Sequence, residues 1–142
     1  LALIISYSRE KIENKIHQKS DLEGLIPYKL IDTLALDSRN SWDENITLFE
    51  KNNSIKKTVL NIGIISLEED KSYIKKLFYE NIVKIFEQKS FYLIDELSEI
   101  NKTDQQILLF ETSSFNKDTL EKFLRKLKIE EASIIGWFCI EK

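Results

Sequence analysis

The junction at residues 64–72 carries the residue types most suggestive of chemistry in this sequence. A predicted strand there leads into a long helix, and Lys71 and Ser72 stand at the helix start, as in a phosphate-binding loop. Such a loop needs glycines, because its backbone must turn through positive φ to direct successive N–H groups at the phosphates. No glycine lies between Ser66 and Lys71. The lysine and serine of a phosphate site are therefore present without the loop that would hold the phosphate.

Three carboxylates occupy the same junction. Glu68, Glu69 and Asp70 would lie where a triphosphate binds. At about 5 Å and an effective dielectric constant of about 20, each would repel a phosphate charge by roughly 3 kcal/mol. Ser66 and Glu69 also have the spacing of a capping box, and acidic residues suit the positive end of a helix dipole. We therefore predict a capped helix that does not bind nucleotide.

Other candidate residues are fewer. Asp95 and Glu96 follow one predicted strand and Glu111 ends another, so these carboxylates could gather at the carboxyl edge of a parallel sheet. With no base, metal ligand or glycine loop nearby, we interpret them as solvated loop positions. The one histidine, His17, and the one cysteine, Cys139, do not assemble a metal site or a catalytic triad. We predict no catalytic residue, no metal and no cofactor.

The second part of the chain, residues 58–142, is predicted to be an α/β core. Long helices are predicted from the junction to about Gln88 and at 116–128, and strands at 58–65, 91–94, 106–110 and 133–140. The strands are apolar on both sides, which favours a mostly parallel sheet with helices on both faces and a degenerate P-loop-like form. The same element order also fits a ferredoxin-like α+β fold, which stays an alternative.

Residues 1–57 are predicted to form N-terminal peripheral helices, at 8–19 and 37–49, separated by a turn around Gly24 and Pro27. In the second of these helices Trp42, Ile46 and Phe49 share one face. A chain of 142 residues has room for one core, so the two parts are expected to make a single domain.

The segment at 1–19 allows two interpretations. Five apolar residues come first, and the basic residues Arg9, Lys11 and Lys15 follow, as on the cytoplasmic flank of a membrane span. This predicts a membrane-proximal segment, with a span before Leu1. A short core strand or a helix start explains the apolar residues equally well.

Charge and cysteine content restrict the partners and the compartment. The formal net charge is −3 and lysines are scattered among carboxylates, so no basic stripe is available to neutralise a run of phosphates. We predict no nucleic-acid partner. A single cysteine inside an apolar run is expected to be a buried thiol, which suits a reducing compartment.

Taken in order, several segments resemble the cytoplasmic portion of bacterial polysaccharide co-polymerases fused to P-loop tyrosine kinases, which are chain-length determinants of capsule and exopolysaccharide export. Residues 1–23 look like the exit from that family's second membrane span. Residues 60–66, with Lys71 and Ser72, are similar to its Walker A strand and loop. Asp95 matches the first aspartate of its second Walker motif. These three residues are the residual P-loop positions.

Departures from the family pattern bear on activity. The Walker A glycines are missing, Leu97 stands where the second aspartate would be, and the stretch between Asp95 and Gln106 is too short for the family's middle region. The resemblance therefore implies a kinase-dead relative that does not bind ATP.

Such a relative would be a non-catalytic regulatory or scaffold domain of a chain-length determinant, at the cytoplasmic face of the inner membrane. Its partner would be a protein of polysaccharide export or another copy of itself. Two alternatives remain: a small soluble protein-binding or inhibitor module of ferredoxin-like fold, and a residual nucleotide-binding enzyme that uses Lys71 and Ser72.

Overall fold

The computed structural model describes residues 19–52, 55–67, 72–112 and 116–141. The described strands are β1 (Leu30–Ala35), β2 (Asn61–Ser66), β3 (Ser90–Leu93), β4 (Gln105–Glu111) and β5 (Ile134–Glu141). They form one sheet in the order β1-β5-β4-β2-β3, and every neighbouring pair is parallel. The prediction of an α/β fold with a parallel sheet is therefore confirmed. The ferredoxin-like alternative is wrong, because that fold requires an antiparallel sheet.

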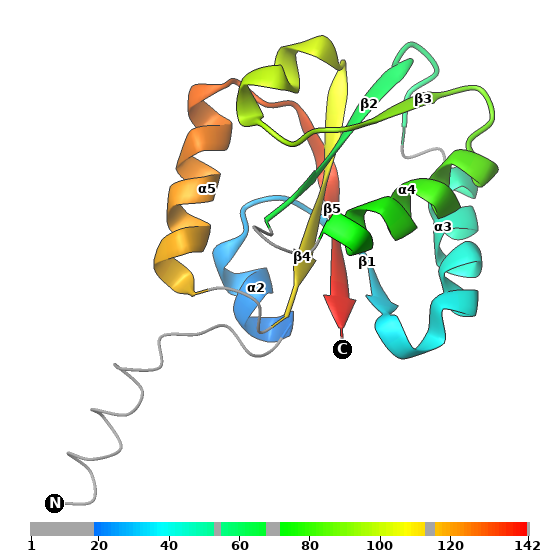
Figure 1. Cartoon of the computed structure of the whole chain (residues 1–142), viewed down its shortest axis with the longest axis horizontal. Coiled ribbons are helices and arrows are strands. Elements are labelled where there is room, and N and C mark those ends of the chain that lie inside the picture. The colour runs from blue at the N-terminus through cyan, green and yellow to red at the C-terminus, as the bar shows by residue number, and fades with distance from the viewer. Residues whose placement is uncertain (1–18, 53–54, 68–71, 113–115, 142) are drawn as a thin grey trace, which may run out of the picture.

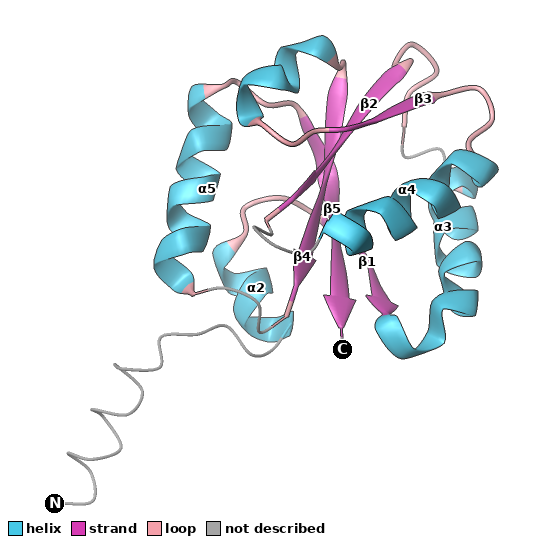
Figure 2. Ribbon diagram, viewed as in Figure 1, coloured by secondary structure: helices cyan, strands magenta, loops and turns pink. Residues whose placement is uncertain are grey.

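Helices cover both faces of the sheet (Figures 1 and 2). They are α2 (Lys19–Leu25), α3 (Trp42–Lys51), α4 (Ser72–Ile85) and α5 (Lys117–Ile129), with 3-10 turns η1 (Leu36–Ser41) and η2 (Leu97–Lys102). One hydrophobic cluster joins the sheet to α3 and α4, and a second joins it to α2, α5 and η2. We call these two sides the α3/α4 face and the α2/α5 face.

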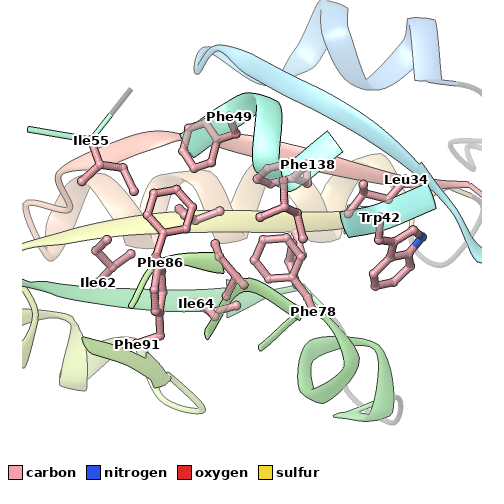
Figure 3. Packing of buried hydrophobic residues seen from close by; sticks show 14 of the residues in the cluster. Leu34, Trp42, Phe49, Ile55, Ile62, Ile64, Phe78, Phe86, Phe91 and Phe138 are labelled. Carbon is pink, nitrogen blue, oxygen red and sulfur yellow. The ribbon is translucent and has the colours of Figure 1, made fainter. Parts of the chain in front are cut away.

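Packing on the α3/α4 face follows the predicted helix periodicity. Ile74, Phe78 and Ile82 of α4 lie four residues apart and are buried, as predicted from the apolar spacing. Phenylalanine rings extend this core: the Phe86 ring centroid lies 5.7 Å from that of Phe49 and 5.8 Å from that of Phe91 (Figure 3). Since Phe91 belongs to β3, this chain of rings reaches the edge of the sheet.

The central strands are apolar on both sides because both of their faces are covered. In β4, Ile107 and Leu109 belong to the α3/α4 cluster, whereas Leu108 and Phe110 belong to the α2/α5 cluster. Cys139 of β5 is fully buried, as expected. On the α2/α5 face α5 begins with an N-cap, because the Asn116 side chain accepts a hydrogen bond of 2.9 Å from Thr119 N.

Strand β1 was not predicted. The expectation that residues 1–57 contain only peripheral helices is wrong, because β1 is an edge strand of the same sheet and pairs with β5. Its central Asp32 breaks the apolar run, and most of its residues are half-buried, so the strand lacks a clear period of two.

One of the two predicted N-terminal helices is also corrected. The helix predicted at 37–49 is the turn η1 followed by α3, although Trp42, Ile46 and Phe49 are buried on one face as expected. Residues 19–25, expected to follow a helix as a turn, form α2. The helix predicted at 8–19 and the membrane-proximal segment at 1–19 lie outside the described residues, apart from Lys19.

Gly63 of β2 is required for close packing. A Cβ atom at this position would overlap Ile94 Cδ1 and would lie 3.0 Å from Thr103 Oγ1. Ile94 and Thr103 flank η2, the crossover from β3 to β4. The absence of a side chain at residue 63 therefore lets the crossover lie directly on the α2/α5 face.

Candidate functional site

The carboxyl ends of β2 and β4 define the position where a doubly wound sheet binds its ligand. If the strands are counted in chain order from β2, the order β3-β2-β4-β5 is the doubly wound order 2-1-3-4. Strand β1 takes the place of the fifth strand, beside β5. The chain leaves β2 for α4 on one face and leaves β4 for α5 on the other. The topological switch point therefore lies between these two strands, and it coincides with the junction selected from the sequence.

The start of this junction differs from the capping-box prediction. Ser66 is the last residue of β2, and Leu67 N donates to Leu109 O at 3.4 Å, so the contact with β4 continues past the strand end. Ser66 is therefore not the N-cap of α4, and the predicted capping box is wrong at this residue. Glu68, Glu69, Asp70 and Lys71 lie outside the described residues, and Ser72 is the first described residue of α4.

Lys75 in the first described turn of α4 binds the end of β3. Its Nζ lies 2.7 Å from Asp95 Oδ1 and 3.1 Å from Ile94 O. The lysine side chain is 10% exposed and that of Asp95 is 78% exposed, so a nearly buried ammonium meets a carboxylate at the surface. The hydrogen bond from Lys75, with its positive charge, holds the pKa of Asp95 below its ordinary value.

Lys75 was missed in the sequence, although a signal was present. It stands three residues before Phe78 and seven before Ile82, so it falls on the apolar face of α4. A lysine at such a position is usually paired, because burying an unpaired ammonium is costly. Its partner could not be identified without the position of β3. Asp95, one of the three residual P-loop positions, thus forms an ion pair with a lysine of its own domain.

The carboxylates at the carboxyl edge divide into two kinds. β3 and β4 are the two neighbours of β2, so Asp95 and Glu111 lie on either side of it at this edge. Asp95 and Glu96 are exposed, as expected for solvated positions. Glu111 is only 1% exposed, so its predicted solvation is wrong. Its place in the alternation of β4 puts it on the same face as Ile107 and Leu109, which α3 and α4 cover.

The remaining candidates do not add a reactive group at this edge. Within the described ranges, no set of three histidine, cysteine, aspartate or glutamate side chains could hold a metal ion. Cys139 is buried inside β5, and His17 lies outside the described residues. The described part of the switch point therefore presents the Lys75–Asp95 ion pair and the buried carboxylate of Glu111.

A cavity of about 440 Å³ lies at the opposite end of the sheet, between α3 and the edge strand β1. Its lining comes from the amino ends of β1 and β5 and from the end of α3, and includes Lys29, Asp32, Phe49 and Ile135. Ligands of doubly wound sheets bind at the carboxyl ends of the strands. This cavity is therefore separate from the switch point.

Comparison of the chain with protein-family models, curated proteins and solved structures found no match. In the part of the chain that the structure describes, no helix combines the length and apolar character needed to cross a membrane.

Proposed function

We propose that this chain is a non-catalytic regulatory or scaffold domain of an exopolysaccharide or capsule chain-length determinant. It acts at the cytoplasmic face of the inner membrane through protein contacts and does not bind ATP. The membrane connection is a segment preceding Leu1. The partner is a protein of polysaccharide export or another copy of the domain.

The ion pair between Lys75 and Asp95 carries this proposal. A phosphate site at the switch point would need a free cation near the start of α4, and the aspartate would need to face the ligand rather than a lysine of its own domain. Here Lys75 Nζ has two acceptors, Asp95 Oδ1 and Ile94 O. Lys75 and the aspartate that resembles a Walker residue thus neutralise each other.

The sequence of the junction supports the same proposal. No glycine lies between Ser66 and Lys71, and three consecutive carboxylates precede Lys71. A backbone without glycine does not readily form the phosphate cradle, and the carboxylates repel phosphate charge. The strand and helix framework persists around this junction, as expected for a domain kept for its surface rather than for catalysis.

A cellular experiment separates a scaffold from an enzyme. In the source organism, one strain would lack residues 19–142 of the gene product and a second would carry only Lys71→Ala. We expect the deletion to change the length distribution of the surface polysaccharide and Lys71→Ala to leave it as in the wild type. If Lys71→Ala reproduces the deletion, the domain acts through a catalytic lysine and the proposal is wrong. If the deletion leaves polysaccharide length unchanged, the assignment to chain-length control is wrong.

A further inference from the structure

The two edges of the sheet differ in how their outward backbone groups are used. At the β1 edge side chains bond them: the Asp32 carboxylate accepts from Thr33 N at 2.8 Å, and Asn45 Nδ2 donates to Thr33 O at 3.0 Å. Trp42 Nε1 likewise donates to Ala35 O at 2.8 Å. Side chains that occupy edge groups prevent another strand from pairing there. The β1 edge is therefore closed at Thr33 and at the Ala35 carbonyl.

The β3 edge is open. Ser90 N donates to Leu60 O at 2.8 Å and Ile94 N to Ile64 O at 3.0 Å, so the even-numbered residues of β3 bond to β2. The backbone groups of Phe91 and Leu93 consequently point away from the sheet. Among the residues that the structure describes, no group donates to or accepts from them. These two residues present the backbone donors and acceptors that an added strand requires.

We propose that two copies of this chain pair through their β3 strands, antiparallel and around a two-fold axis at Tyr92. Phe91 of one copy then lies opposite Leu93 of the other, and each such pair exchanges both N–H···O bonds. This register uses all the outward groups of both residues. Pairing Phe91 with Phe91, or Leu93 with Leu93, would use only half of them. The sheets of the two copies join into one continuous sheet.

Side chains near the axis fit this register. Tyr92 of one copy faces Tyr92 of the other as a non-hydrogen-bonded pair, in which side chains approach most closely. Tyr92 is 49% exposed and is therefore available for that contact. Lys89 and Asp95 stand just beyond the two ends of β3, so in this register the lysine of one copy lies near the aspartate of the other at both ends of the paired segment. The strand is therefore complementary to itself in hydrogen bonding, and the charges that flank it are of opposite sign.

Both charged residues keep capacity for this contact. Lys89 Nζ donates to Lys56 O and Val59 O, and an ammonium has three donors. Asp95 uses Oδ1 for Lys75, and its side chain is 78% exposed. The proposed pairing therefore requires neither residue to give up a bond that it makes within its own copy.

Helix α4 extends the surface beside β3. Lys75, Tyr79 and Val83 lie four residues apart and form one row along the helix, and the bond from Lys75 to Asp95 places that row on the β3 side. Tyr79 is half-buried and Val83 is 39% exposed. The row lies on the sheet face that Phe91 faces, opposite to the Tyr92 side chain, and adds apolar side chains beside β3 that a four-residue strand alone would not provide. This inference gives a geometry for the self-association named in the proposed function, and it does not depend on whether the domain binds nucleotide.

Sedimentation velocity of the 142-residue chain over a concentration series tests the association. We expect a reversible dimer, and a wild-type chain that stays monomeric at the highest concentrations would overturn the proposal. Tyr92→Lys and Tyr92→Glu each place like charges on the axis and should weaken the dimer at least about tenfold. The control is Tyr73→Lys, because Tyr73 is 50% exposed but stands on α4 outside the row that follows β3. It should dimerise as the wild type does.

Mixing the two Tyr92 variants tests the register itself. Opposite charges then face each other on the axis, so the mixture should recover a heterodimer that neither variant forms alone. Failure of the mixture to associate, or dimers that persist in both single variants, would contradict a two-fold axis at Tyr92.

A covalent test does not depend on affinity. In Tyr92→Cys the paired Cα atoms would lie about 4.5 Å apart, within the range of a disulfide, so mild oxidation should give a cross-linked dimer rapidly. Cys139 is fully buried and does not compete. The matched variant Tyr73→Cys should cross-link at least about tenfold more slowly, because random collisions lack the high effective concentration of a bound pair. Equal rates for the two variants would contradict the proposed surface.

Discussion

Lys75 and Asp95 bind one another across the junction of α4 and β3, with 2.7 Å between Nζ and Oδ1. The same ammonium donates to Ile94 O at 3.1 Å. One side chain thus connects the beginning of α4 to the end of the edge strand β3. This contact lies at the carboxyl ends of the strands, where doubly wound sheets bind their ligands. The lysine serves the structure of the domain, and this relationship underlies the proposal that the site does not bind phosphate.

Removal of Asp95 should destabilise the domain modestly. A hydrogen bond to a charged group is commonly worth about 1.5–3 kcal/mol, but exposure of the Asp95 side chain reduces this, so Asp95→Ala should lower the free energy of unfolding by about 1 kcal/mol. Urea denaturation measures the change. The control is the adjacent exposed carboxylate, because Glu96→Ala should stay within about 0.5 kcal/mol of the wild type. Equal effects of the two substitutions would show that the ion pair contributes no stability.

Acid should weaken the domain through two aspartates. Hydrogen bonds from Asn61 N and Leu60 N, at 3.0 and 3.1 Å, lower the pKa of Asp104, and Lys75 lowers the pKa of Asp95. A carboxyl group whose pKa is lower in the folded state stabilises that state fully above its unfolded pKa of about 3.9. This contribution is lost as the pH falls through the folded-state pKa.

The measurement is the urea midpoint between pH 6 and pH 2. The wild-type midpoint should fall steeply below about pH 4. A double variant with Asp95→Asn and Asp104→Asn should begin lower at pH 6 and fall less. Parallel curves for the two proteins would mean that these carboxyl groups do not determine the acid sensitivity.

Gly63→Ala should destabilise the packing between β2 and the η2 crossover. The added methyl group overlaps Ile94 Cδ1, and Ile94 is 4% exposed, so it has little room to move. Overpacking of this kind costs about 1–3 kcal/mol, which thermal or urea unfolding would detect. Gly24→Ala is the control, because nothing lies within 4 Å of its added Cβ and Gly24 lies in α2. It should be neutral or stabilising by up to about 1 kcal/mol. A Gly63→Ala variant as stable as the wild type would contradict the described packing.

The sequence predicted those elements whose apolar pattern, either a continuous run or a helical repeat, reflects burial. β4 and β5 were recognised because both of their faces are covered, and α4 because Ile74, Phe78 and Ile82 repeat at the helix spacing. β1 was missed because an edge strand has fewer covered positions, and Asp32 in its middle bonds to the next backbone N–H. The polar Asp32 in β1 protects the edge of the sheet by bonding to an outward backbone group. This role can be recognised only once the strand order is known.

The site was predicted less completely than the fold. The switch point was found from its strand-to-helix junction, but the partner of Lys75 comes from β3, twenty residues further along the chain. Glu111 has the composition of a solvated loop residue, yet its strand lies between β2 and β5 and beneath helices, so it is buried. Burial of a polar residue depends on contacts between distant segments, and no local pattern in the sequence records them.

Calorimetric titration of the 142-residue chain with Mg-ATP and Mg-ADP at moderate salt tests the absence of a nucleotide site most directly. We predict no saturable heat at millimolar ligand, in the wild type and in Lys71→Ala alike, because the junction lacks glycines and Lys75 is bound to Asp95. Saturable binding that Lys71→Ala abolishes would show that the junction is a working phosphate site, and it would contradict the proposal of a non-catalytic domain.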